Sequence, residues 1–313
     1  MYISYEYIRF INMKKYFKVK MTILKERLEL EHLRLRAFYL PAFIFLLTTF
    51  TLINVYHTYQ HINVWSNMPE AGGNAFHFCE ANRMDEAIRQ PSNTWSNLGY
   101  LLVGLFALTL AVHDYKNKER RESDNFLVMY PFFSVLYGLS CLYLFVGSFM
   151  YHASLTLMFQ KLDQTGLYSV IGMILILNIY KINPYLYHKG EWKNTHAFAK
   201  LLVIVLNIAF FKWLWKFDIN ILVPIMLVFT FVTSIYYIRK VSKTDYFVNY
   251  MYAGFFILFA AGSIWMLDRE GLACNPQSAL QGHALWHVLT AASMFFIYLY
   301  YRSGTLRLAP DQG

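Results

Sequence analysis

Polar residues that could perform chemistry lie at the ends of two long apolar runs. Residues 147–152 (GSFMYH) end one run, and Asp163 follows His152 by eleven positions. Near the C-terminus, residues 282–287 (GHALWH) begin another run. Ionisable side chains are costly to place at membrane depth, so they usually mark a functional site there. Three histidines, an aspartate and a serine in these positions predict a metal site that performs chemistry inside a bilayer.

The spacing of the histidines favours zinc. His283 and His287 are four residues apart, so on a helix they lie one turn apart on the same face. Such a pair suits zinc, and three histidines with one open position form the pattern of a catalytic zinc site. No glutamate follows His283, so this is not the H-E-x-x-H protease motif and a general base must lie elsewhere. The alternative is that both histidines bond only backbone or water at a helix end.

Ser148 and Asp163 could complete such a site. Ser148 precedes His152 by four residues, and Asp163 opens the next predicted span. A nearby carboxylate can take the proton from an attacking water and return it to the leaving group. A serine hydroxyl can hold that water or the developing oxyanion. The structural alternatives are an N-cap role for Asp163 and a close helix contact beside Gly147 for Ser148.

Composition predicts a membrane protein. Of the 313 residues 57% are hydrophobic and only 15% are charged, against roughly 25% charged in soluble domains. The net charge is +9, but the basic residues gather between apolar runs, which is typical of membrane topology and not of a nucleic-acid surface. A cleavable signal peptide is not expected, since the first apolar run begins near Phe38 after a long basic lead. Three cysteines are too few for a disulfide scaffold, although one pair is possible.

The apolar runs predict an all-α, multipass transmembrane helix bundle. They recur near residues 38–56, 94–112, 126–149, 164–180, 198–215, 219–238, 246–267 and 283–301, with lengths that suit a ~30 Å hydrocarbon core. The last seven runs have short connections, so we expect a seven-helix core and one additional N-terminal transmembrane helix at 38–59. Residues 1–37 form a basic cytosolic segment, either an amphipathic helix on an anionic membrane face or a solvated tail. Pro131 and Pro224 lie inside spans and are expected to kink them.

The charges of the loops predict the orientation. Basic residues mark the N-terminal segment, the loops 113–125, 181–197 and 239–245, and the C-terminus as cytosolic. The loops 57–92, 150–163 and 268–282 should then lie on the outer, periplasmic or lumenal, side, and 212–218 with two lysines is a mild exception. The candidate residues consequently converge near the outer face: Ser148, His152, Asp163, His283, His287, Cys79 and Cys274.

Four segments resemble the alkaline ceramidase family: residues 79–82 (CEAN), 93–97 (NTWSN), 147–152 through Asp163, and 282–287. This family belongs to a superfamily of seven-helix membrane hydrolases that also includes the progestin and adiponectin receptors. The resemblance covers about residues 75–302, with all motifs in the family's order. It implies hydrolysis of the amide bond of ceramide to a sphingoid base and a fatty acid. The site residues that it implies are zinc ligands at His152, His283 and His287, with Ser148 and Asp163 completing the catalytic set.

The resemblance also implies a disulfide bond between Cys79 and Cys274. The predicted topology permits this bond because both residues lie on the oxidising side. The alternative is two unpaired thiols. Cys141 lies in the middle of a span and is expected to pack in the core.

The sequence departs from the family at the calcium site. Glu80 and Asn82 remain as possible ligands, but His77 stands where an aspartate is expected and Gln90 where a glutamate is expected. Fewer carboxylates bind a hard cation more weakly, so calcium is doubtful. Glu80 and Asn82 can instead cap this segment or pin it against the bundle.

Three alternatives to a ceramidase remain. One is a related hydrolase acting on another lipid amide or ester, and the second is a receptor-like membrane protein with structural zinc. The outward position of the site favours the ceramidase branch over the inward-facing receptors. The third is a transporter with a proton relay, but the inverted repeat that it predicts is not seen. The expected partners are the membrane and a ceramide-like lipid, and no nucleic acid.

Overall fold

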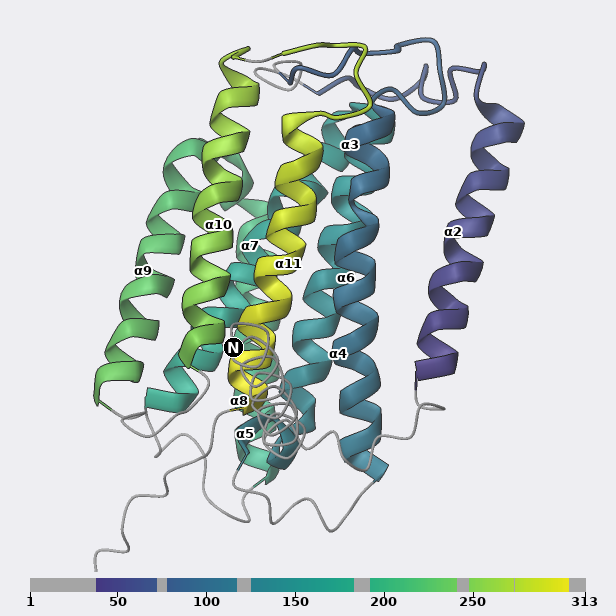
Figure 1. The fold of residues 1–313 in the computed structure, drawn as a ribbon. Helices are drawn as coiled ribbons and strands as arrows, with labels where there is room; N and C mark the ends of the chain where they lie inside the picture. The colour runs from purple at the N-terminus through teal and green to yellow at the C-terminus, as the bar shows by residue number, and fades with distance from the viewer. Residues whose placement is uncertain are drawn as a thin grey trace, which may run out of the picture.

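The protein is a bundle of long helices that run side by side (Figure 1). The computed structural model describes residues 38–71, 78–116, 125–182, 192–240, 248–272 and 274–303, and no β-strand occurs among them. The helices are α2 (Tyr39–Tyr59), α3 (Pro91–Ser96), α4 (Leu98–Lys116), α5 (Phe126–Met129), α6 (Pro131–Ser154), α7 (Leu157–Ile182), α8 (Trp192–Lys212), the short 3-10 helix η5 (Leu214–Lys216), α9 (Ile219–Lys240), α10 (Val248–Arg269) and α11 (Gly282–Ser303).

The apolar character of these helices confirms the predicted multipass membrane fold. In the described part of the chain, seven helices are long and apolar enough to cross a membrane: α2, α3 with α4, α6, α7, α9, α10 and α11. The remaining predicted span, near residues 198–215, corresponds to α8, which packs against α7. That α8 also crosses the membrane stays a prediction.

The core lies where α4, α6, α7 and α11 meet. Helix α6 packs between α4 and α7, and α11 packs against α10, α4 and α3. Buried tyrosines bond across these contacts: the Tyr137 hydroxyl donates to the Met294 carbonyl, and that of Tyr298 donates to the Ser134 hydroxyl. Because a buried hydroxyl must find a partner, these bonds fix how the helices face one another.

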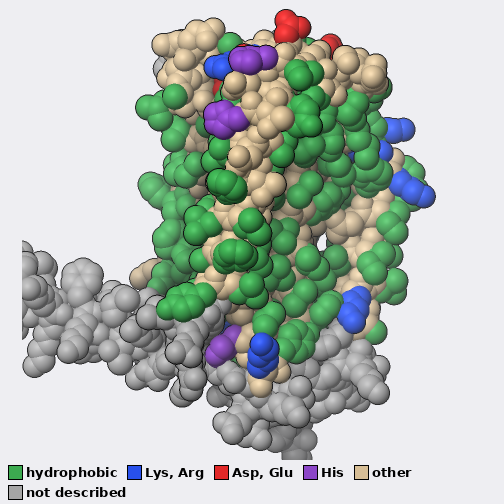
Figure 2. All heavy atoms as spheres, turned by 90° about the vertical axis from the view of Figure 1, so that its right-hand side faces the viewer, with side chains coloured by type: hydrophobic (Ala, Val, Ile, Leu, Met, Phe, Trp, Pro, Cys, Tyr) green, Lys and Arg blue, Asp and Glu red, His purple; other side chains and the backbone are tan. Residues whose placement is uncertain are grey.

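Helix α2 lies outside this core, as expected for the additional N-terminal helix. None of its residues is buried, and it stands at the edge of the bundle beside α4 (Figure 1). Stacked rings of Phe38 and Phe106, and a Tyr56–Trp95 pair with centroids 6.2 Å apart, join it to the bundle. Figure 2 faces this side and shows hydrophobic side chains over most of its height, with acidic side chains at the top and histidines near the top and the bottom.

Around the candidate site, the helices end at other residues than those predicted. The expected outer loop at 150–163 is wrong, because α6 continues to Ser154 and α7 begins at Leu157. The turn is formed by Leu155, which adopts a left-handed conformation with φ of 48° and whose carbonyl accepts a hydrogen bond from the Ala71 N–H. Polar residues such as His152 and Ser154 are buried with partners, so the helix does not end where the apolar run ends. Asp163 consequently lies in the second turn of α7 and is not an N-cap.

The expected kink at Pro131 is also wrong. The span splits at Tyr130: Asn125 caps the short helix α5, and Pro131 is the first residue of α6. Proline is favoured at this position because it lacks only an N–H that a helix start leaves unpaired. Pro224 does lie inside α9. The predictions for residues 1–37 lie outside the described residues.

Candidate metal centre

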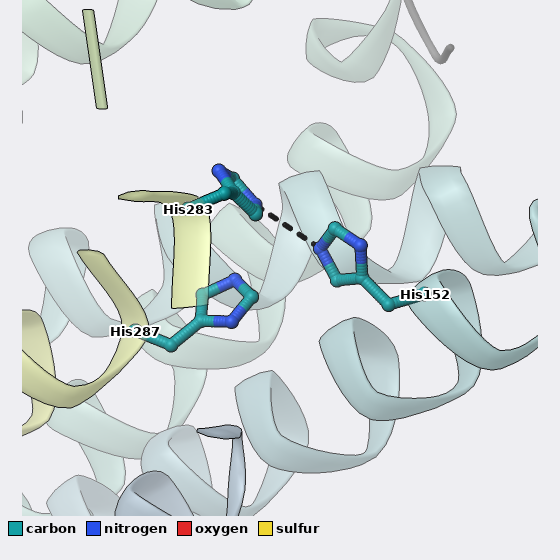
Figure 3. Close-up of side chains that lie close together, drawn as sticks. All are labelled: His152, His283 and His287. Atoms are coloured by element: carbon teal, nitrogen blue, oxygen red, sulfur yellow. Dashed lines mark hydrogen bonds between the residues drawn. The ribbon is translucent and has the colours of Figure 1, made fainter. Parts of the chain in front are cut away.

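Three histidines from two distant helices converge at one end of the bundle. His152 lies in the last turn of α6, and His283 and His287 lie in the first two turns of α11 (Figure 3). One ring nitrogen from each lies within 4.8 Å of the other two. Nε2 of His152 and Nε2 of His283 lie 3.1 Å apart. All three residues are at most 5% exposed, and among the described residues they form the one such group that could hold a metal ion.

In His152 and His287, the ring nitrogen Nδ1 lies within hydrogen-bond distance of an oxygen atom. Nδ1 of His152 lies 2.7 Å from Oε1 of Gln90, and Nδ1 of His287 lies 3.0 Å from the carbonyl oxygen of Asn93. Because amide and carbonyl oxygens only accept hydrogen bonds, both Nδ1 atoms carry the proton. The Nε2 atoms are therefore free of hydrogen and available as ligands, the arrangement usual for metal-binding histidines. The donor set fits a metal ion that prefers imidazole, such as zinc.

The short helix α3 brings these oxygens to the histidines. Its start is held by Glu80, whose two carboxylate oxygens accept the backbone N–H groups of Ser92 at 2.7 Å and Asn93 at 2.8 Å. The side chain of Gln90 also donates from Nε2 to Oδ1 of Asn82, at 2.6 Å. Burial raises the pKa of Glu80, while the N–H groups of Asn93 and Ser92 oppose that rise. Glu80 and Asn82 thus make the capping and pinning contacts that were the alternative to calcium binding; His77 lies outside the described residues.

Ser148 and Asp163 meet beside the histidines. Ser148 is buried one turn before His152 on α6, and its hydroxyl lies next to the carboxylate of Asp163 on α7. Gly147 permits this contact, since a Cβ there would come within 2.6 Å of the Leu162 carbonyl oxygen. Asp163 also lies within electrostatic range of Tyr100, whose ring centroid is 6.0 Å from that of His287. A serine and a carboxylate are therefore close together, one helical turn from His152, where they could handle protons.

The disulfide bond between Cys79 and Cys274 is present, with an S–S distance of 2.08 Å. It ties the segment before α3 to the segment between α10 and α11, which meet at the site end of the bundle (Figure 1). The carboxylate of Asp268, at the end of α10, accepts the backbone N–H of Cys79 at 3.1 Å. The pairing implied by the resemblance is thus confirmed, and Cys141 is a buried free cysteine, as expected.

Sequence reasoning missed three residues that contact the histidines. Gln90 was noticed only as a departure from a calcium site, although it bonds His152. The hydroxyl of Ser96 lies 2.8 Å from Nδ1 of His287, and the ring of Phe78 lies against His283. Ser96 belongs to the NTWSN motif, so that motif was a usable signal. The sequence contained no signal for Phe78, because the position of this residue depends on the path of an irregular segment.

A comparison with protein-family models found one match. The model described as Ceramidase matches residues 73–311. The matched region begins after α2 and contains α3 to α11, with all three histidines, Ser148 and Asp163. The comparison with curated proteins found no match.

Proposed function

Because the chain belongs to the ceramidase family, we propose that its catalytic centre is a zinc site formed by His152, His283 and His287. Membership makes the protein a membrane hydrolase of the ceramide amide bond, a linear C–N bond. The observation that carries the proposal is the convergence of three buried histidine nitrogens within 4.8 Å. Three neutral imidazoles with room for a further ligand are the usual surroundings of catalytic zinc.

Zinc, when bound, would supply Lewis-acid chemistry that activates water and polarises a carbonyl oxygen. The protein's own residues hold and orient it. His152 and His287 keep their Nε2 lone pairs directed inward because Gln90 and Asn93 accept their Nδ1 protons. The site is enclosed in the bundle, so electrostatic interactions act there in a low dielectric and are stronger than in water.

Asp163 and Ser148 handle the proton and the developing negative charge. The Asp163 carboxylate accepts the proton of the attacking water and returns it to the departing sphingoid amine, as a general acid–base. The Ser148 hydroxyl lies beside Asp163, and once Asp163 has taken up the proton of the water, Ser148 donates its own hydrogen bond to the amide oxygen on which the negative charge develops. Their closeness to each other, and the place of Ser148 one turn from His152, support these roles.

A small apolar pocket of about 30 Å³ lies near the catalytic residues. It lies between α7, α9, α10 and α11 and begins one helical turn beyond the catalytic residues. Leu167 follows Asp163 by four residues, and Thr290, whose hydroxyl bonds the His287 carbonyl, lines the pocket on α11. The proposed lipid substrate follows from the family match.

We propose that the site faces the outer, periplasmic or lumenal, side and that both termini are cytosolic. Basic residues lie at the opposite helix ends, including Lys116 of α4 and Lys181 of α7, and basic segments stay on the cytosolic side. A C-terminal tag found on the periplasmic or lumenal side of the membrane would contradict this orientation.

The proposed activity is tested by metal removal in purified protein. After treatment with a chelator the protein should lose ceramide hydrolysis, and addition of zinc should restore it. Hydrolysis of ceramide and of a phospholipid is compared in the same preparation to establish the substrate. Full ceramide hydrolysis by protein shown to be metal-free would contradict the zinc proposal, and cleavage of the phospholipid alone would contradict the substrate.

A further inference from the structure

The three histidine rings are not held in the same way. Hydrogen bonds orient two of them: Gln90 accepts from His152, and Asn93 accepts from His287. Nδ1 of His283 is buried and has no hydrogen-bond partner among the described residues. When the second ring nitrogen of a metal-binding histidine makes no hydrogen bond, another contact is needed to keep the ligand lone pair directed at the metal.

The ring of Phe78 supplies such a contact. It lies against the His283 ring with centroids 3.9 Å apart and the two planes tilted by 31°. In the described structure it is the one ring outside the histidine group that lies against His283. Aromatic rings in contact attract with a preferred geometry, so this contact resists rotation of the imidazole.

The backbone next to Phe78 is fixed at several points. Cys79 is bonded to Cys274, and its N–H donates to the Asp268 carboxylate at 3.1 Å. Two residues later, the N–H of Ala81 donates to the Pro276 carbonyl, also at 3.1 Å. The side chain of Phe78 packs against a small apolar cluster of Ala71, Tyr151 and Leu155. The disulfide and these contacts hold the ring in its place.

We infer that Phe78 is a positioning residue that orients His283 for metal binding and that the Cys79–Cys274 bond anchors it there. This inference rests on the proposed zinc site. Without the ring, the His283 imidazole turns about its side-chain bonds, and Nε2 no longer points steadily toward His152. The protein then binds zinc more weakly even though all three ligands remain.

The test measures zinc affinity of the purified full chain by competition with a chromophoric chelator. Phe78→Ala should weaken zinc binding by about tenfold to a hundredfold, as for other residues that orient a metal ligand. Phe78→Trp retains an aromatic ring and should bind zinc as the wild type does. Phe159→Ala is the matched control, since Phe159 packs against the same apolar cluster and its ring pairs with Trp65 and, in the described structure, with none of the three histidines. Cobalt substitution gives a second readout, because the absorption of bound cobalt reports the geometry of its ligands.

Phe78→Leu keeps the apolar volume if the alanine variant does not fold, and it should also weaken binding. Wild-type affinity in Phe78→Leu or Phe78→Ala would overturn the inference and leave the proposed zinc site standing. An equal loss in Phe159→Ala would overturn it too, because the effect would then come from packing of the segment. A wild-type protein that binds no zinc would overturn both proposals.

Discussion

Nδ1 of His152 donates a hydrogen bond to Oε1 of Gln90 over 2.7 Å, and the same glutamine donates from Nε2 to Asn82. This pair links a histidine at the end of α6 to the segment that carries the disulfide bond and leads into α3. Through it, the irregular segment before α3 determines which nitrogen of His152 faces the other two histidines.

Replacing Gln90 should therefore weaken zinc binding. Gln90→Met has a similar length but no acceptor, so the buried Nδ1 proton of His152 loses its partner. We expect zinc affinity to fall about tenfold to a hundredfold. Gln90→Glu, which keeps an acceptor oxygen, is the control and should retain tight binding. Equal affinities of Gln90→Met and the wild type in the chelator competition would show that this bond does not orient the ligand.

Removing Ser148 or Asp163 should separate catalysis from metal binding. Ser148→Ala should lower kcat about a hundredfold to a thousandfold, the usual effect of losing one oxyanion donor. Asp163→Asn should lower it by about 10²–10⁴, the range for general acid–base groups. Zinc content should stay at the wild-type level in both, because neither residue belongs to the histidine group.

Ser169→Ala is the matched control for these variants, since Ser169 makes a buried α7–α6 hydrogen bond to Ser140 deeper in the bundle. It should keep wild-type kcat. If Asp163→Asn also keeps wild-type kcat, the proton passes through another group.

Gly147 should not tolerate a side chain. A Cβ at this position would lie 2.6 Å from the Leu162 carbonyl oxygen and 2.8 Å from the Asp163 nitrogen, and backbone atoms cannot move aside locally. Gly147→Ala should cost about 1–3 kcal/mol of stability through overpacking and should displace Asp163 from Ser148. Thermal unfolding in detergent and kcat measure the two effects.

Gly262→Ala on α10 is the control for this change, because the nearest atom to its Cβ would be on the Trp286 ring at 3.9 Å, an ordinary contact. A Gly147→Ala protein as stable and active as Gly262→Ala would mean that α6 and α7 are not in such close contact.

Glu80 should contribute to stability by capping α3. Glu80→Ala removes the acceptor of two backbone N–H groups at a buried helix start, and losing an N-cap costs about 0.5–2 kcal/mol. Glu86→Ala in the same segment is the control. It breaks only a half-exposed ion pair with Arg83. Such surface ion pairs contribute about 0–1 kcal/mol to stability. Unfolding in detergent should rank Glu80→Ala as the less stable protein, and the opposite order would contradict the capping role.

Sequence predicted the helices well and their ends poorly. Apolar runs locate the middle of a span because the hydrocarbon core demands about twenty apolar residues. They do not locate its end when polar residues such as His152 find partners inside the bundle. For this reason α6 and α7 extend toward each other through the predicted loop, and Asp163 lies in a helix and not at its cap.

The residues of the candidate site were likewise predictable only in part. The spacing of His283 and His287, and the motif around Ser148 and His152, indicated which side chains would meet. The contacts of Gln90 and Phe78 were not predictable, since both residues lie in an irregular segment without periodicity. Its path is set by a bond to Cys274 that joins positions 195 residues apart.

The most direct test measures zinc content and ceramide hydrolysis in the same purified samples of wild type, His283→Ala and His57→Ala. His57 is the control histidine, exposed near the end of α2 and outside the family match. We predict about one zinc ion per chain and active hydrolysis for wild type and His57→Ala, since three histidines hold one catalytic zinc. His283→Ala should lose both the zinc and the activity. Ceramide hydrolysis retained by His283→Ala at the wild-type rate would contradict the account.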